Sequence, residues 1–166
     1  MNETPTARLE ALQAAAQREP HRGDVRYLLG AELASAGRYE SAIEELTHAV
    51  GLDQSLHTAK LQLGLLHLTC AHRAEALAAW RPLDELPRSE PLRMFARGLK
   101  ALANDDFRSC IALLERGMHL NTANPALNHD MALIIDRARS ASGNERSAEG
   151  PEGVRTDFSL YEPDEQ

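Results

Sequence analysis

The chain has 166 residues and a formal net charge of −7, and only 4% of its residues are aromatic. This length is enough for one domain with a hydrophobic core, and apolar content carried mainly by Leu and Ala favours helices over sheets. Residues 141–166 hold seven acidic and two basic side chains. An acidic end segment on a nearly neutral body argues against nucleic acid or an anionic membrane surface as the partner.

The two cysteines, Cys70 and Cys110, are too few for a disulfide framework, which favours a reducing compartment. The first residues lack the basic and apolar regions of a signal peptide. No apolar run approaches the ~20 residues that a membrane-spanning helix needs. We therefore expect a cytoplasmic protein that does not insert into membranes.

The first predicted helix begins at Pro5, where Thr4 can cap it and the missing N–H of proline leaves no helical hydrogen bond unmade. Its apolar residues recur at a spacing of three to four to about residue 18. Residues 25–36 and 39–50 then form a helix pair, with Gly37 between them as a left-handed C-cap.

The second predicted pair is less regular. Asp53 or Ser55 is expected to cap its first helix, which runs to about residue 69. The second helix covers residues 74–80, and Pro82 must shorten or kink it because proline removes a hydrogen bond and clashes with the preceding turn. A third pair starts at residues 89–91, breaks at 104–105 and ends near 120.

A last helix is predicted from residue 126 to about 139, capped by Asn124 and Pro125. Its apolar side chains would cover the exposed edge of the helix stack. From Ser140 the composition becomes polar and glycine-rich, which predicts a disordered acidic tail over residues 141–166. The preceding residues 1–140 are predicted to be one helical domain.

Three glycines, Gly30, Gly64 and Gly98, stand 34 residues apart. A small residue follows each of them after twelve positions and a large apolar residue after sixteen: Ala42, Ala76 and Cys110, then Leu46, Trp80 and Leu114. A period of this length indicates a two-helix unit copied three times. We expect the glycine and the small residue to let the two helices approach, and the large residue to fill the space between neighbouring units.

With Leu29, Leu33, Gly37, Tyr39 and Ala49, these positions resemble the tetratricopeptide repeat (TPR) pattern over residues 24–122. The resemblance implies an all-α, right-handed solenoid of three antiparallel helix pairs. The helix before the first pair is similar to the second half of a unit, and the last helix would act as a cap. Arg97, His67 and Ala71 depart from the pattern, which puts in question the regularity of the second and third units.

In this family the first helix of each unit lines a concave groove, and here the resemblance assigns apolar residues to it: Tyr27, Ala31, Ala34, Leu61, Leu65, Leu68, Phe95, Leu99 and Leu102, with Leu92 extending the strip. One interpretation is an apolar groove for an extended or helical peptide. The other is that these side chains pack inside the array. None supplies the Lys, Arg or Asn that relatives use to clamp a terminal carboxylate, so an acidic chaperone tail is not the expected partner.

The acidic tail offers an occupant for such a groove, because Phe158, Leu160 and Tyr161 form an apolar cluster in an otherwise polar segment. A flexible linker of about 17 residues spans roughly 23 Å. The cluster can therefore reach the groove of its own or a neighbouring molecule. The competing interpretation is an inert tail.

Three possible metal ligands, His67, Cys70 and His72, stand close together, with His57 nearby. Structural zinc normally uses four ligands, and no second Cys/His pair accompanies these residues. No nucleophile with an orienting base can be assembled either. We therefore expect no metal, no cofactor and no catalytic residue.

These observations predict a non-catalytic scaffold or adaptor that binds a protein or peptide. One alternative is a chaperone of an apolar secreted or membrane-destined partner, since the size, charge and groove are similar to the class II chaperones of bacterial type III secretion. The other is a homo-oligomeric assembly subunit. The repeat pattern itself does not name the partner.

Overall fold

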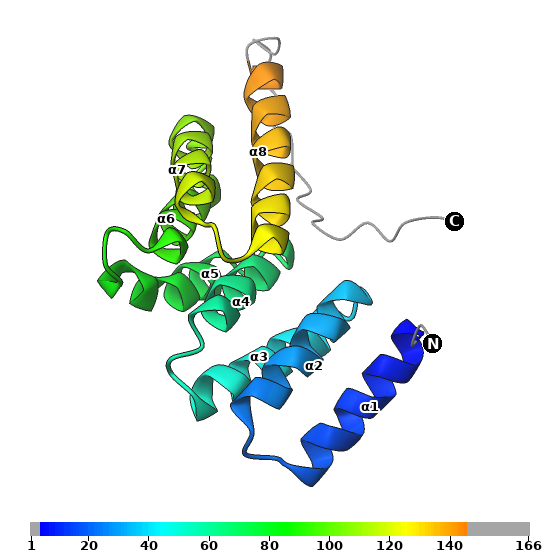
Figure 1. The fold of residues 1–166 in the computed structure, drawn as a ribbon. Helices are drawn as coiled ribbons and strands as arrows, with labels where there is room; N and C mark the ends of the chain where they lie inside the picture. The colour runs from blue at the N-terminus through cyan, green and yellow to red at the C-terminus, as the bar shows by residue number, and fades with distance from the viewer. Residues whose placement is uncertain (1–3, 146–166) are drawn as a thin grey trace.

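The computed structural model describes residues 4–145, which form antiparallel helix pairs stacked in one direction (Figure 1). Within these residues there is no strand, and the elements are α1 Pro5–Arg18, α2 Gly23–Ser35, α3 Tyr39–Leu52, α4 His57–Thr69, α5 Arg73–Trp80, the 3₁₀ helix η1 Arg81–Glu85, α6 Pro91–Ala103, α7 Phe107–Leu120 and α8 Pro125–Glu145. The predicted all-α solenoid is confirmed. No helix in this range is long and apolar enough to cross a membrane.

Side-chain caps begin the first and last helices as the sequence predicts. The Thr4 hydroxyl accepts a hydrogen bond from the Ala7 N–H at 3.2 Å. At α8, Asn124 Oδ1 accepts one from the Leu127 N–H at 3.1 Å. Each bond satisfies an amide that the first turn of a helix leaves without a partner.

The predicted cap of α4 is wrong. The side chain of Asp53 accepts hydrogen bonds from the N–H and the hydroxyl of Ser55, at 2.8 and 2.6 Å. This local turn uses the carboxylate before the helix begins at His57. Leu56 occupies the N-cap position and makes no side-chain cap.

The turns inside the three units share one backbone conformation. Gly37, Ala71 and Asp105 have φ values of 72°, 63° and 58°, in the left-handed region. The glycine cap is confirmed, and the second and third units keep the same turn without a glycine. A residue with a Cβ pays an energetic penalty of about 1–2 kcal/mol in this conformation, so Ala71 is a strained position.

Ala71→Gly is expected to raise the free energy of unfolding by about 0.5–1 kcal/mol, because relief of the left-handed strain exceeds the extra entropy of the unfolded glycine. Gly37→Ala is the reverse control and should lower it by a similar amount, since a Cβ there meets no atom within 4 Å. Urea unfolding of both variants measures the effect. A loss of stability in Ala71→Gly would contradict this account of the turn.

Each repeated glycine supports the large residue of its own unit. A Cβ at Gly30 would lie 2.8 Å from Leu46 Cγ, and one at Gly98 would lie 2.7 Å from Leu114 Cδ2. We predicted these large side chains to lie between neighbouring units, and each shares a hydrophobic cluster with residues of the next unit, such as Leu46 with Leu63 and Trp80 with Phe95. They also cover the glycine of their own unit, and the absence of a Cβ is what admits them.

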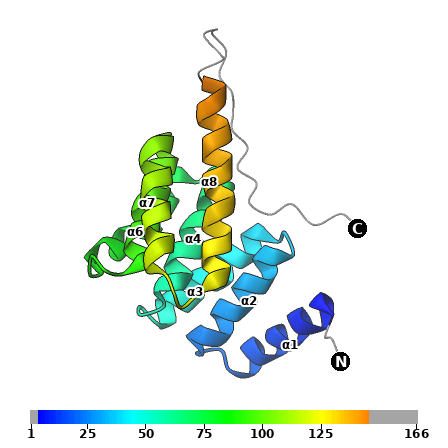
Figure 2. The ribbon, with the colours of Figure 1, turned by 45° about the horizontal axis from the view of Figure 1, so that its top comes forward.

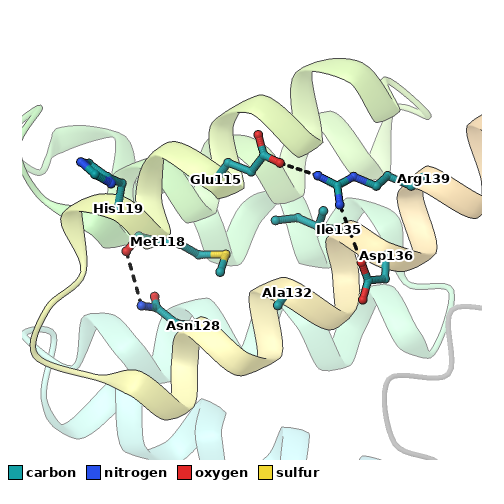
Figure 3. Close-up of a pocket in the computed structure, with 8 residues that line it drawn as sticks. All are labelled: Glu115, Met118, His119, Asn128, Ala132, Ile135, Asp136 and Arg139. Atoms are coloured by element: carbon teal, nitrogen blue, oxygen red, sulfur yellow. Dashed lines mark hydrogen bonds and ion pairs between the residues drawn. The ribbon is translucent and has the colours of Figure 1, made fainter.

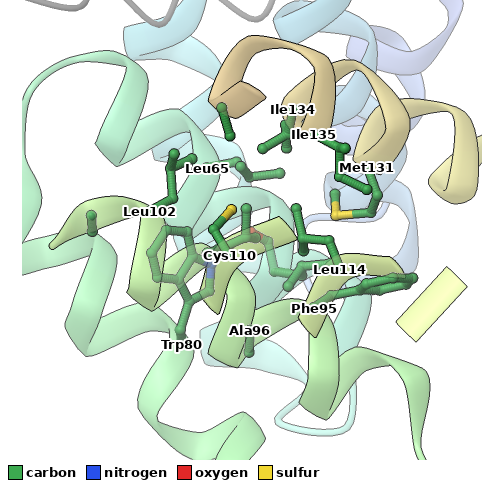
Figure 4. Close-up of a cluster of buried hydrophobic side chains, with 14 of the residues drawn as sticks. Leu65, Trp80, Phe95, Ala96, Leu102, Cys110, Leu114, Met131, Ile134 and Ile135 are labelled. Atoms are coloured by element: carbon green, nitrogen blue, oxygen red, sulfur yellow. Dashed lines mark hydrogen bonds between the residues drawn. The ribbon is translucent and has the colours of Figure 1, made fainter. Parts of the chain in front are cut away.

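Two hydrophobic clusters form the core, and α4 contributes to both. The first joins α1, α2 and α3 to one side of α4, through Leu63 and Leu66. The second joins the other side of α4, through Leu61 and Leu65, to α5, η1, α6, α7 and α8 (Figure 4). α4 therefore couples the two halves of the array.

α8 lies along α7 in both ribbon views and closes the second cluster, as predicted for a capping helix (Figures 1 and 2). Its core side chains are at most 5% exposed: Leu127, Met131, Ile134, Ile135 and Ala138. The helix continues to Glu145, past the predicted end near residue 139, so the predicted tail boundary at 141 falls within a helix. Phe158, Leu160 and Tyr161 lie outside the described residues, and their docking stays a prediction.

Candidate partner-binding groove

The structure buries most of the apolar strip that the sequence analysis proposes as a groove. The buried members are 0–8% exposed: Ala34, Leu61, Leu65, Phe95, Leu99 and Leu102. Tyr27, Ala31, Leu68 and Leu92 are half-buried. The first set is packed internally, which was the alternative interpretation, and an exposed groove at these six positions is wrong.

The physical reason is that this strip faces the first helix of the following unit. Leu61 and Leu65 of α4 share a cluster with Leu99 of α6. α6 is covered in turn by Ile134 and Met131 of α8 (Figure 4). The strip is therefore the contact surface between successive units, and the stacking of the units buries it.

α8 is itself the first helix of a fourth unit. Ala132 stands 34 residues after Gly98, and Leu133 stands 34 after Leu99. Leu99 is fully buried, whereas Leu133 is 42% exposed because no following helix within the described residues covers it. α8 thus has the register of a first helix and lacks a second helix in this part of the chain.

A groove of about 420 Å³ lies between α7 and α8, where that second helix would pack (Figure 3). α7 contributes Glu115, Met118 and His119, and α8 contributes Asn128, Ala132, Ile135, Asp136 and Arg139. The floor is apolar, since Met118 and Ala132 are half-buried and Ile135 is 4% exposed. The residues at the rim are charged or polar.

Asparagines hold the start of α8 against the end of α7. Asn121 is buried, and its Nδ2 donates to Asn128 Oδ1 and to the Asn124 carbonyl, both at 2.8 Å. Asn128 Nδ2 donates back to the Asn121 carbonyl at 3.0 Å. This network satisfies the carbonyl groups at the end of α7, so it sets the angle of the groove.

An ion pair crosses the far part of the groove. Arg139 donates to Glu115 Oε1 at 2.6 Å and lies 3.9 Å from Asp136 Oδ1 (Figure 3). The Arg139 side chain is 57% exposed and that of Asp136 is 73% exposed. An exposed pair contributes little to stability, so breaking it costs little free energy.

A second hollow, of about 480 Å³, lies at the equivalent place in the first unit. Two of its walls are α1 and α2, and five of the residues there stand three periods of 34 before residues of the α7–α8 groove. On α1, Gln13, Ala16 and Gln17 correspond to Glu115, Met118 and His119. On α2, Arg26 and Leu33 correspond to Asn128 and Ile135. α3 supplies a third wall, through Arg38, Ser41, Glu44 and Glu45. The α7–α8 groove has only two walls from the described residues.

This groove was not predicted from the sequence, although the repeat contains a signal for it. Extending the 34-residue period to Ala132 places a small residue at the glycine position of a fourth unit. The equivalent position in α2 is Gly30, onto which Leu46 of α3 packs. The residue at this place in α8 is small as well, although Ala132 carries a Cβ that the glycines lack.

The histidines and cysteines form no comparable site. The rings of His67 and His72 lie 5.8 Å apart, and burial, helped by His72, lowers the pKa of His67. Burial raises the pKa of Cys110 to about 12, which leaves its thiol unreactive. No group of three or more His, Cys, Asp or Glu side chains among the described residues is placed to hold a metal ion.

No protein-family model matches the chain, and no curated protein sequence matches it. Among solved structures, the "MamA 41-end" chain from Desulfovibrio magneticus RS-1 is 18% identical with a TM-score of 0.57, covering 88% of this chain and 88% of that chain. The fold is of the TPR type. A MamA RS-1 double mutant, ArsTM, is 15% identical with a TM-score of 0.57, covering 87% of this chain and 88% of that one. At these identities the likeness concerns the fold.

Proposed function

We propose that this chain is a non-catalytic protein-interaction scaffold whose α7–α8 groove binds an α-helix of a protein partner. The observation that carries the proposal is the missing third wall. α3 supplies a third wall to the equivalent hollow beside α1 and α2, and no described element supplies one beside α7 and α8. An unpartnered apolar floor with a polar rim is the form of a helix-binding groove.

The equivalent pairs describe the helix that fits. Gly30 is covered by Leu46 and Gly98 by Leu114, so the partner helix presents a large apolar residue to Ala132. The rim carries Glu115 and Asp136 with Arg139 between them, which leaves one net negative charge and favours a basic side chain next to that residue. An apolar secreted or membrane-destined partner, as in the chaperone alternative, would present such a helix as well.

The test is selection from a phage-displayed library of helix-stabilised peptides against the full chain. Selected peptides should bind at least about tenfold more weakly to Ala132→Trp, because the indole fills the floor of the groove. The matched control is Ala112→Trp, on the exposed outer side of α7 and outside the groove. It should bind the same peptides as the wild type does.

Circular dichroism must show that both tryptophan variants are folded. Peptides that bind wild type and Ala132→Trp equally well would contradict a helix site in this groove. Selection of extended, proline-containing peptides in place of helices would contradict it too.

A further inference from the structure

α1 has the features of the helix that the α7–α8 groove lacks. It resembles the second helix of a unit whose first helix is absent from the described residues, just as α8 is a first helix without a second. Leu12 stands three periods of 34 before Leu114, which is fully buried on Gly98. Leu12 itself is only half-buried, because no first helix among residues 4–145 covers it. The two ends of the array are therefore complementary in register.

The charges at the two ends are complementary too. Residues equally far from the turn face each other in a unit: a Cβ at Gly30 would meet Leu46, and one at Gly23 would lie 3.3 Å from Asp53 Cβ. By the same symmetry, Ala34 faces Ala42. In α8 the residue equivalent to Ala34 is Asp136, three periods of 34 later. In α1 the residue equivalent to Ala42 is Arg8, one period earlier. An α1 docked beside α8 would bring Arg8 to Asp136.

Both residues depart from the repeat, and the departures compensate. Arg8 stands where the units have Ala42, Ala76 and Cys110, and Asp136 stands where the units have Ala34, Leu68 and Leu102. Their side chains are 58% and 73% exposed. Among the described residues, Arg8 makes a long ion pair of 3.7 Å with Glu32, and Asp136 makes a long one of 3.9 Å with Arg139.

We propose that α1 of a second copy docks in the α7–α8 groove, with Leu12 on Ala132 and Arg8 paired with Asp136. This inference rests on the proposed function, because it names the helix that occupies the same groove. The interface joins different surfaces of the two copies, so it repeats from copy to copy and yields chains or rings. The fourth unit is then completed between molecules.

The first measurement is the mass of the full-length chain by sedimentation over a wide concentration range. We expect a mass that rises with concentration through dimer and larger species. Arg8→Glu should weaken association about tenfold or more, because it sets like charges against each other. Asp136→Arg should do the same. The double variant Arg8→Glu with Asp136→Arg should restore association, which a general loss of folding would not produce.

A mixture tests the direction of the contact. Arg8→Glu keeps an intact groove, and Ala132→Trp keeps an intact α1. Mixed together they should form a one-to-one dimer and stop, because each has one working end. Larger species, or no dimer, would overturn the head-to-tail arrangement.

These experiments distinguish a failure of self-assembly from a failure of the proposed helix-binding function. A wild-type chain that stays monomeric at every concentration overturns this inference. If library peptides then still bind in a manner sensitive to Ala132→Trp, the groove retains its helix-binding function with another partner. The opposite result is that the peptides bind wild type and Ala132→Trp equally well, while Arg8→Glu and Asp136→Arg still weaken self-association. Binding of helices from other proteins is then excluded, and the self-assembly of this chain is supported.

Discussion

Gly64→Ala is expected to lower the free energy of unfolding by about 2–3 kcal/mol. A Cβ at this position would lie 2.1 Å from Nε1 and 2.4 Å from Cε2 of Trp80. The indole is fully buried, and its N–H donates to the Leu61 carbonyl at 3.0 Å, so the ring cannot move without losing this bond. Overpacking of about 1–3 kcal/mol and the lost hydrogen bond outweigh the gain of about 1 kcal/mol in helix propensity.

Gly51→Ala is the matched control. Gly51 is also helical, in α3, but it is exposed and a Cβ there meets no atom within 4 Å. Only the helix propensity changes, so this variant should gain about 0.5–1 kcal/mol. Urea unfolding followed by circular dichroism gives both values. Equal gains at the two positions would show that the glycine period does not arise from close packing.

Leu99→Asp is expected to cost about 4 kcal/mol, a large share of the stability of a domain this size. Leu99 lies on α6 and is fully buried in the cluster that α6 shares with α4 and α8, so an unpaired carboxylate there has no solvent and no partner. If the strip were an open groove, as the resemblance to the TPR family implies, the same substitution would leave the fold intact. The variant therefore decides between the two interpretations.

Leu133→Asp occupies the same register one period later and provides the comparison. Its side chain is 42% exposed, so the change in stability should stay within about 0.5 kcal/mol. Thermal unfolding of the two aspartate variants under one condition measures the contrast. A folded Leu99→Asp protein with wild-type stability would restore the groove interpretation.

Much of the fold could be predicted from the sequence, because local chemistry and the period determine it. Thr4, Pro5 and Pro91 mark helix starts, and Pro82 ends α5 at Trp80, after which η1 begins. The predicted helix cap of α4 was wrong because another local structure can use the same side chain. Asp53 forms a turn with Ser55 in place of a helix cap, and both outcomes use the same carboxylate.

The candidate site was not predictable in the same way, because burial depends on what stacks next. Leu99 and Leu133 are the same residue type at the same place in the unit. One is buried and the other exposed only because α8 follows the first and no described helix follows the second. The composition of a single helix does not contain this information. The register of α1 and α8 does, because the described part of the array begins with a second helix and ends with a first helix.

Trp80 is the only tryptophan of the chain, and it belongs to the second hydrophobic cluster. Its fluorescence therefore reports on the α4–α8 side of the molecule, while far-ultraviolet circular dichroism reports on every helix. Coincident unfolding curves from the two signals mean that α4 transmits cooperativity across the array. A displacement between the curves means that the two clusters unfold in separate steps, and the unlabelled wild-type protein is enough to detect it.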